Sequence, residues 1–304
     1  MSSTYKKQFP VVVVLLAAAV WGLFWIPLRA FESNGLSPIW TTLAQFVVPL
    51  LVLLPIALIR VFRGLPTGIN QVLTGVLVAL AFSLYYNSLL LTDVVRSLIL
   101  FYITPAWSTL LEVLIMKRRI RIWRFLALIS GFSGLIVILG VEGQIPVPRN
   151  LGDTMALCAG VVWAIGSMRV RLADDVSTFE QIFSFFFYGS LVSILFLFLP
   201  IAELGTAPSL DVFFHLWPWM LLMTVTLLIP MMWGLLWGSQ LIDPGRLGIL
   251  LQMEAIVGIG SAAVLTNEPF GIREILGTAL VVSAGLLDVL GQRSRKTHRA
   301  EVTF

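Results

Sequence analysis

The sequence predicts an all-α integral membrane protein, with ten transmembrane helices arranged as two inverted five-helix repeats. Three observations lead to this fold class: the composition, the spacing of apolar segments and the distribution of basic residues. Of the 304 residues, 58% are apolar and only 12% are charged, whereas soluble domains carry about 25% charged residues. A soluble globule of this size could not hide so much apolar surface, because most of a folded surface faces water.

Ten apolar segments are each close in length to the ~20 residues that a helix needs to cross a bilayer. They are bounded by charged residues and by Pro and Gly clusters, and the short connections leave no room for an inserted soluble domain. Because backbone groups in lipid must be satisfied internally, runs of this length indicate helices. In chain order the expected helices cover residues 10–30, 38–59, 69–91, 96–116, 123–141, 151–170, 179–200, 213–238, 245–266 and 271–291.

The 20 Lys and Arg residues are distributed unevenly between the two sides of this arrangement. With the N-terminus in the cytoplasm, 16 of them fall in cytoplasmic stretches. The four outside are Arg29, Arg96, Arg149 and Arg273. Because basic residues resist translocation, this bias predicts that both termini are cytoplasmic, in a plasma or inner membrane.

The two halves of the chain resemble each other, which predicts an internal duplication with repeats at 1–145 and 146–304. A unit of five helices ends on the opposite side of the membrane from where it begins, so the second copy is inverted, as in many secondary transporters. One chain then holds both halves and is plausible as a monomer. The matches are Trp21 and Arg29 with Trp163 and Arg171, Asp93 and Arg96 with Asp243 and Arg246, Ile99-Leu100 with Ile249-Leu250, and Gly134 and Gly140 with Gly285 and Gly291.

Four short motifs are informative at this point: Trp21-Gly22, Thr104-Pro105, Gln252-Met253-Glu254-Ala255 and Asn267-Glu268-Pro269. Over essentially the whole chain, they resemble the drug/metabolite transporter superfamily, specifically its ten-helix permeases with two EamA-type repeats. Two positions depart from the family pattern. Ala255 replaces a proline, and Met116-Lys117 stand near the place where the first half would carry Gly-Glu. The resemblance implies export of small metabolites, commonly amino acids.

Glu254 is the residue most informative about function, because it lies near the middle of the segment 245–266. A charge at that depth costs at least ~2.5–3.5 kcal/mol on insertion scales, so the side chain should face the bundle interior or a wet cavity. Loss of water disfavours the charged carboxylate, so Glu254 could exchange a proton or bind a substrate ammonium group. It would thereby couple export to proton entry. The alternative is a protonated glutamate that hydrogen-bonds a neighbouring helix.

Eight further side chains carry polar atoms deep inside apolar segments and are candidates for substrate binding. A buried indole N–H needs a partner, which a substrate carboxylate could supply, and Tyr and Asn could hydrogen-bond a zwitterion. The competing explanation for each is ordinary packing inside the bundle. These candidates are Trp21, Trp25, Tyr85, Tyr86, Asn87, Tyr102, Trp107 and Trp163.

Two prolines inside expected helices are candidate hinges. Pro105 lies near the middle of the fourth segment and Pro230 lies inside the eighth. Proline removes a backbone hydrogen bond and kinks a helix, although it is common in membrane helices. Other charges are expected to be structural: Arg29 pairs with Glu32 at the outer end of the first segment, and Glu268 caps a helix.

Catalysis and metal binding find little support in the sequence. The single cysteine, Cys158, excludes an internal disulfide and a thiolate cluster, and two histidines leave little acid–base or metal chemistry. No Gly-x-Ser-x-Gly motif occurs. We therefore expect no enzyme activity, no cofactor, no metal and no nucleic-acid partner.

The expected function is secondary active export of small metabolites, with amino acids as the first substrate class, membrane lipid as the surroundings and protons as a candidate coupling ion. An exporter of cationic drugs or quaternary ammonium compounds is the alternative, because Glu254 could bind a cation directly. From other classes, a membrane-embedded enzyme and a membrane receptor or scaffold stay open.

Overall fold

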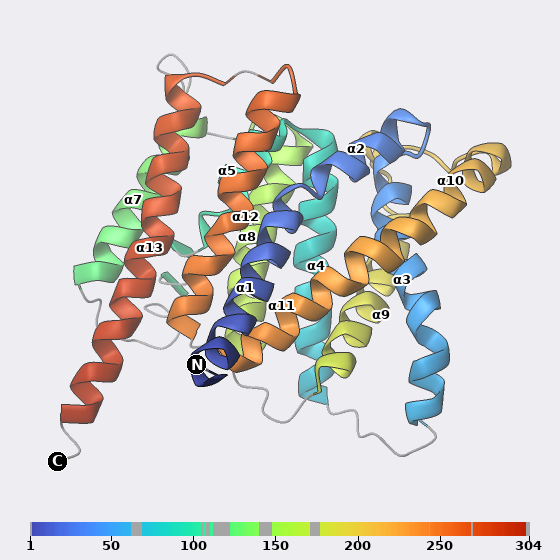
Figure 1. The fold of residues 1–304 in the computed structure, drawn as a ribbon. Helices are drawn as coiled ribbons and strands as arrows, with labels where there is room; N and C mark the ends of the chain where they lie inside the picture. Colours follow the sequence, from blue (N-terminus) through green and yellow to red (C-terminus); the bar gives the residue numbers. More distant parts are fainter. Residues whose placement is uncertain are drawn as a thin grey trace.

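The structure is a computed structural model that describes residues 2–61, 69–104, 106–107, 110–111, 122–139, 148–170, 177–242, 244–268 and 270–301. Throughout these residues the regular structure is helical, with no strand. The helices pack side by side, and both chain ends lie at the same end of the bundle (Figure 1).

The described helices fall on the ten segments expected from the sequence, which confirms the all-α fold class. The first half contains α1 (Ser2–Gly22), α2 (Trp25–Ser33), α3 (Pro38–Val61), α4 (Ile69–Leu91), α5 (Val94–Phe101) and α7 (Ile122–Leu139). The second half contains α8 (Leu151–Val170), α9 (Thr178–Phe196), the short turn η1 (Ala202–Leu204), α10 (Leu210–Met223), the π-helical turn η2 (Thr224–Leu228), α11 (Ile229–Leu241), α12 (Pro244–Leu265) and α13 (Ile272–Glu301).

Five of the described helical stretches are, by length and composition alone, long and apolar enough to cross a membrane. Three others contain shorter apolar stretches, in α7, α8 and α12. The five long stretches are Gln8–Ser33, Pro38–Arg60, Val72–Leu91, Thr178–Phe196 and Leu210–Gly238.

Three of the ten segments are interrupted, each shortly before a proline. α1 gives way to α2 at residues 23–24, ahead of Pro27, and η2 lies directly ahead of Pro230, the second residue of α11. α5 ends ahead of Pro105, a predicted hinge that lies outside the described residues. A proline cannot donate to the carbonyl four residues earlier, which favours a rearranged turn before it. Four other prolines, Pro10, Pro49, Pro55 and Pro218, lie inside continuous helices.

The loss of one such donor is compensated near the end of α5. The carbonyl of Phe101 stands four residues before Pro105 in the sequence. The hydroxyl of Thr104 donates to this carbonyl at 2.6 Å. A side-chain hydroxyl thus satisfies a backbone acceptor that proline cannot serve.

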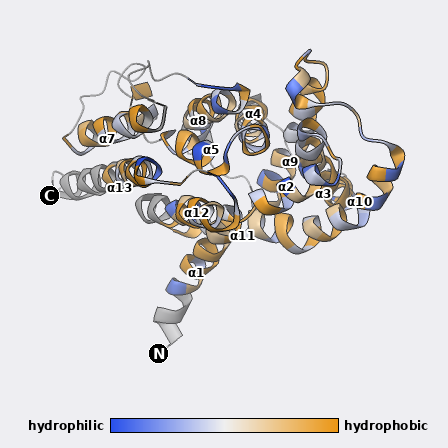
Figure 2. Cartoon of the chain, turned by 90° about the horizontal axis from the view of Figure 1, so that it is seen from above, coloured by the Kyte–Doolittle hydropathy of each residue, from blue (hydrophilic) through white to orange (hydrophobic). Residues whose placement is uncertain are grey.

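Helix contacts repeat between the two halves, as two inverted copies require. α1 packs on α12 and α11, while α8, the corresponding first helix of the second half, packs on α5 and α4. α7 packs on α13 and α3 packs on α9, so helices with the same place in the two repeats contact each other. Viewed from above, α7 and α13 lie at one edge of the bundle and α3 and α10 at the other (Figure 2).

Candidate substrate site

The carboxylate of Glu254 lies inside the bundle and is bound by a tyrosine from the other repeat. The Tyr85 hydroxyl, on α4, donates to Glu254 Oε1 at 3.2 Å. Tyr85 is almost fully buried, whereas Glu254 is only partly buried. The sequence prediction that Glu254 faces the interior is therefore correct.

Tyr102 lies beside the same carboxylate on the side of α5. Its hydroxyl donates to the backbone carbonyl of Leu251 at 3.3 Å, one turn before Glu254 on α12. The ring of Phe101 stacks on Tyr85 with centroids 4.3 Å apart. Two helices of the first repeat thus position phenol rings around one carboxylate of the second.

The α1–α2 break packs against the face of α12 that carries Glu254. A Cβ atom built on Gly22 would lie 2.5 Å from the Glu254 carbonyl oxygen and 2.9 Å from the Gly258 nitrogen. The backbones therefore approach as closely as glycine allows. One turn further, the Trp25 indole N–H donates to Ser261 Oγ at 3.0 Å. Trp25 was predicted to offer this N–H to substrate, but in this structure Ser261 accepts it.

A buried aromatic cluster adjoins the carboxylate on the α1 side. Tyr86 has ring centroids within 6.4 Å of Trp21, Phe24, Phe46, Phe82 and Tyr85. Phe82 also makes an edge contact with Trp163 at 5.3 Å. The N–H of Trp21 and the hydroxyl of Tyr86 are buried and have no hydrogen-bond partner within the described part of the chain. Buried polar groups usually have one, so these two atoms could bind a ligand.

Two predicted candidates lie elsewhere. Asn87 donates to the Ser83 carbonyl at 2.8 Å, and Ser83 in turn contacts Ser193 of α9 at 3.4 Å. Asn87 thus belongs to the face of α4 that packs on α9. Trp107 makes an edge contact with Phe132 at 5.3 Å, toward α7.

Sequence reasoning missed Ser261 and Phe101 as contacts of the site. A signal for Ser261 was present, because Gly258 and Ser261 follow Glu254 by four and seven residues and therefore share its helix face. Phe101 had no such signal, since its contact depends on how α5 packs against α4.

The two repeats differ at the site itself. Asp93, Arg96 and Ile99 each have a counterpart 150 residues later. At the same spacing, Thr104-Pro105 correspond to Glu254-Ala255. The first copy thus has a hydroxyl and a helix break, whereas α12 has a carboxylate and runs unbroken through Ala255. A single carboxylate therefore serves a site that is otherwise built from both halves.

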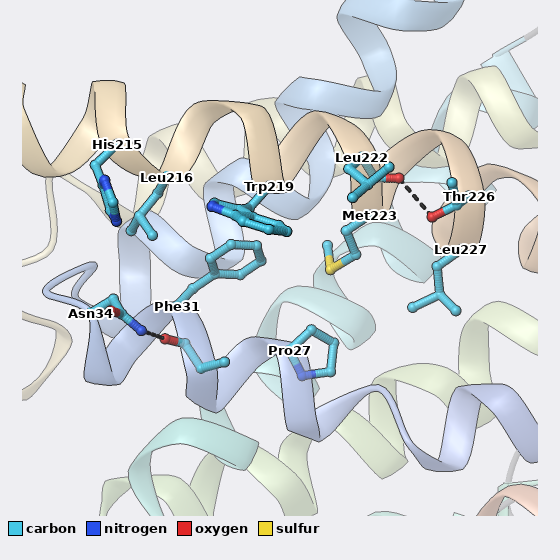
Figure 3. A pocket seen from close by; sticks show the side chains of 11 residues that line it. Pro27, Phe31, Asn34, His215, Leu216, Trp219, Leu222, Met223, Thr226 and Leu227 are labelled. Atoms are coloured by element: carbon cyan, nitrogen blue, oxygen red, sulfur yellow. Dashed lines mark hydrogen bonds between the residues drawn. The ribbon is translucent and has the colours of Figure 1, made fainter.

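A separate groove of about 460 Å³ runs between α2 and the α10–η2 segment (Figure 3). Phe31, Trp219 and Met223 form much of its wall, with His215 and Asn34 near one end. None of its lining residues was predicted to bind substrate. The groove is distinct from the Glu254 site.

The described residues contain no group of three or more His, Cys, Asp or Glu side chains that could hold a metal ion. Glu254 instead has the phenol groups of Tyr85 and Tyr102 as neighbours.

Comparisons with known proteins agree with this architecture. The model of the EamA-like transporter family matches residues 8–140 and 150–288, one match in each half. A search of curated proteins finds no match. Among solved structures, the match to one crystal structure covers 92% of this chain and 98% of the chain in that structure, with 17% sequence identity and a TM-score of 0.57. At that identity, the likeness concerns the fold alone.

The fold and the site thus define a multi-pass helical membrane protein with a carboxylate enclosed between two repeats. The chain belongs to the EamA-like transporter family. It is therefore a membrane transporter of the drug/metabolite transporter superfamily, and family members are transporters rather than enzymes.

Proposed function

We propose that this transporter is a secondary active exporter of small metabolites, with amino acids as its substrate class, and that it works by alternating access. The observation that carries the proposal is the Glu254 carboxylate, which lies in the interior of the bundle and accepts a hydrogen bond from Tyr85 of the other repeat. In the proposed orientation both termini are cytoplasmic, in the plasma or inner membrane, and one chain forms the working unit.

Glu254 can couple substrate movement to proton movement because an unpaired charge is costly away from water. When a substrate ammonium group is bound, the carboxylate is charged and the two charges compensate each other. When the site is empty, a proton on Glu254 removes the charge. Proton and substrate then compete for the same oxygen atoms, so one enters as the other leaves.

The unpartnered N–H of Trp21 and hydroxyl of Tyr86 are suited to the other end of an amino acid. Both groups can donate a hydrogen bond to a substrate carboxylate. Both belong to the aromatic cluster that adjoins Glu254 through Tyr85. An α-amino acid would thus be held by its ammonium group at Glu254 and by its carboxylate at these donors.

A second candidate substrate class is organic cations, including quaternary ammonium compounds. The specific observation that favours it is the proximity of the carboxylate to several aromatic rings, because a cation is attracted by ring faces as well as by the opposite charge. Such a substrate would need Glu254 but no donor for a carboxylate.

Counterflow in proteoliposomes, with a panel of amino acids and of quaternary ammonium compounds, tests the proposal with and without a pH gradient. We expect amino-acid counterflow that a pH gradient accelerates, and its loss in Glu254→Gln. Glu203→Gln, which removes an exposed carboxylate outside the helices of the site, should keep the parent rate. Proton-driven transport at full rate in Glu254→Gln would contradict the coupling role. Substrate binding without any movement across the membrane would favour a receptor instead.

A further inference from the structure

One carboxylate from the second repeat joins two helices of the first repeat at the end of the bundle away from the chain termini. Glu268 lies three residues beyond the end of α12, and Figure 1 shows that end of α12 at the end of the bundle away from the chain termini. Its Oε1 lies 3.3 Å from Arg29 Nη2 of α2. Its Oε2 accepts a hydrogen bond from the backbone N–H of Val95 in α5 at 3.2 Å. The side chain of Glu268 is only 8% exposed, so water competes little for these contacts.

Arg29 contacts the neighbouring backbone in a complementary way. Its Nε donates to the Leu89 carbonyl at 3.0 Å, and its Nη2 donates to the Thr92 carbonyl at 2.6 Å. These carbonyls lie at the C-terminal end of α4, whereas Val95 lies at the N-terminal end of α5. A cation and an anion thus bind the helix ends that each favours. The expected partner of Arg29, Glu32, forms no ion pair with it among the described contacts, because the side chain of Arg29 is directed to α4 and Glu268.

In the sequence, the positions that correspond to this ion pair in the other copy of the repeat carry a different pair of residues. Arg171 follows Trp163 at the spacing by which Arg29 follows Trp21. The position that corresponds to Glu268 falls near Met116-Lys117. These positions lie outside the described residues and are compared by sequence alone. The aligned positions therefore do not repeat the Arg–Glu pair, although Glu112, Asp174 and Asp175 stand near them in the sequence.

We propose that Arg29 and Glu268 form a gate at the α2 end. Their contacts join the second repeat to α2, α4 and α5 of the first repeat at this end, and the end opens when they are lost. The empty transporter then rests closed at the α2 end. The proposal rests on alternating access, as part of the proposed function.

α12 connects this gate to the substrate site. Glu254 and Glu268 are 14 residues apart on the sequence, close to four helical turns. Ser261 lies midway between them and is partly buried. A cysteine at position 261 would therefore report whether solvent passes the gate.

Thiol labelling tests the gate without requiring transport. The native cysteine is removed by Cys158→Ser, and Ser261→Cys supplies the reporter. A membrane-impermeant maleimide is applied to intact cells and, separately, to inside-out vesicles, both without substrate. We expect slow labelling from the α2 side in the reporter protein. Glu268→Gln should raise that rate about tenfold, the effect of losing the ion pair with Arg29 from the closed state.

Two further variants make the result specific. Arg29→Gln should raise the same rate, whereas Glu274→Gln should leave it unchanged. Glu274 is a carboxylate at the start of α13, and it contacts the nearby Gly271 N–H at 2.8 Å rather than the other repeat. Fast labelling from the α2 side in the reporter protein itself would overturn the proposal, as would equal rates in all variants. Because the readout is labelling, a negative counterflow result would count against the proposed function and not against the gate.

Discussion

The hydroxyl of Tyr85 and the carboxylate of Glu254, 169 positions apart in the chain, form a 3.2 Å hydrogen bond between the two repeats. This contact joins α4 to α12 in the interior of the bundle. A charged or polar group there needs such a partner, because neither lipid nor bulk water can supply one. The same bond that stabilises the fold therefore also positions the carboxylate that we assign to the substrate.

Removal of the Tyr85 hydroxyl should weaken this connection between the repeats. Tyr85→Phe keeps the ring stack with Phe101 but loses the donor to Glu254, so we expect the free energy of unfolding to fall by about 1–2 kcal/mol. Tyr86→Phe is the matched control, because the Tyr86 hydroxyl has no partner within the described residues. Thermal unfolding in detergent measures both. Equal effects of the two substitutions would show that the hydroxyl of Tyr85 is not a special contact.

The close approach of α1 to α12 depends on Gly22. In Gly22→Ala, the added methyl group would meet the backbone of Glu254 and Gly258, so we expect a loss of stability of about 1–3 kcal/mol from overpacking. Gly260→Ala supplies the contrast on α12. Nothing lies within 4 Å of a Cβ at that position, and alanine is favoured over glycine in a helix by about 0.5–1 kcal/mol. Opposite signs of the two effects are expected in thermal unfolding, and a stabilised Gly22→Ala protein would contradict the close contact.

The proline that the family pattern places after the glutamate can be reintroduced as Ala255→Pro. The substitution removes the helical N–H that would donate to the Leu251 carbonyl, at a usual cost of about 3 kcal/mol or more. Here the Tyr102 hydroxyl already donates to that carbonyl, so we expect a smaller loss. A double-mutant cycle with Tyr102→Phe tests the compensation. Tyr102→Phe should be more destabilising in the Ala255→Pro protein than in the parent, and additive effects would refute the idea.

Arg96 of α5 and Asp153 of α8 form a short and buried ion pair. Arg96 Nη2 lies 2.8 Å from Asp153 Oδ2, and the Asp153 side chain has no exposed surface. In Asp153→Asn, Arg96 would lose its compensating charge inside the protein, and we expect destabilisation of about 3–5 kcal/mol. Asp211→Asn, in the exposed first turn of α10, is the control and should cost under about 1 kcal/mol. Unfolding midpoints in denaturant give the comparison, and similar midpoints would mean that Arg96 finds another partner.

Much of the fold could be predicted because lipid restricts the possible structures. The segments 69–91 and 151–170 match α4 and α8 residue for residue, since an apolar run bounded by polar residues in a membrane protein has one favourable conformation. The interruption before Pro27 was not predicted, whereas Pro105 was predicted to be a hinge and not the end of a helix. The positions of these breaks depend on which local hydrogen bonds replace the missing donor, as Thr104 illustrates.

The site was predicted only in part. Glu254 was identifiable because a carboxylate in mid-membrane is rare and costly, and the tyrosines because their polar atoms interrupt apolar helices. Which of these side chains contact Glu254 could not be predicted from the sequence. Tyr85 and Asn87 are two residues apart on one helix, yet one faces Glu254 and the other lies toward α9.

The sequence by itself determined the membrane environment, the helical class and the twofold duplication, because these follow from hydropathy, length and repetition along the chain. Only the tertiary structure decided that Arg29 pairs with Glu268 rather than with its neighbour Glu32, and that Ser261 takes the N–H of Trp25. Such choices depend on distances between helices that are remote in the chain, and a local pattern carries no information about them.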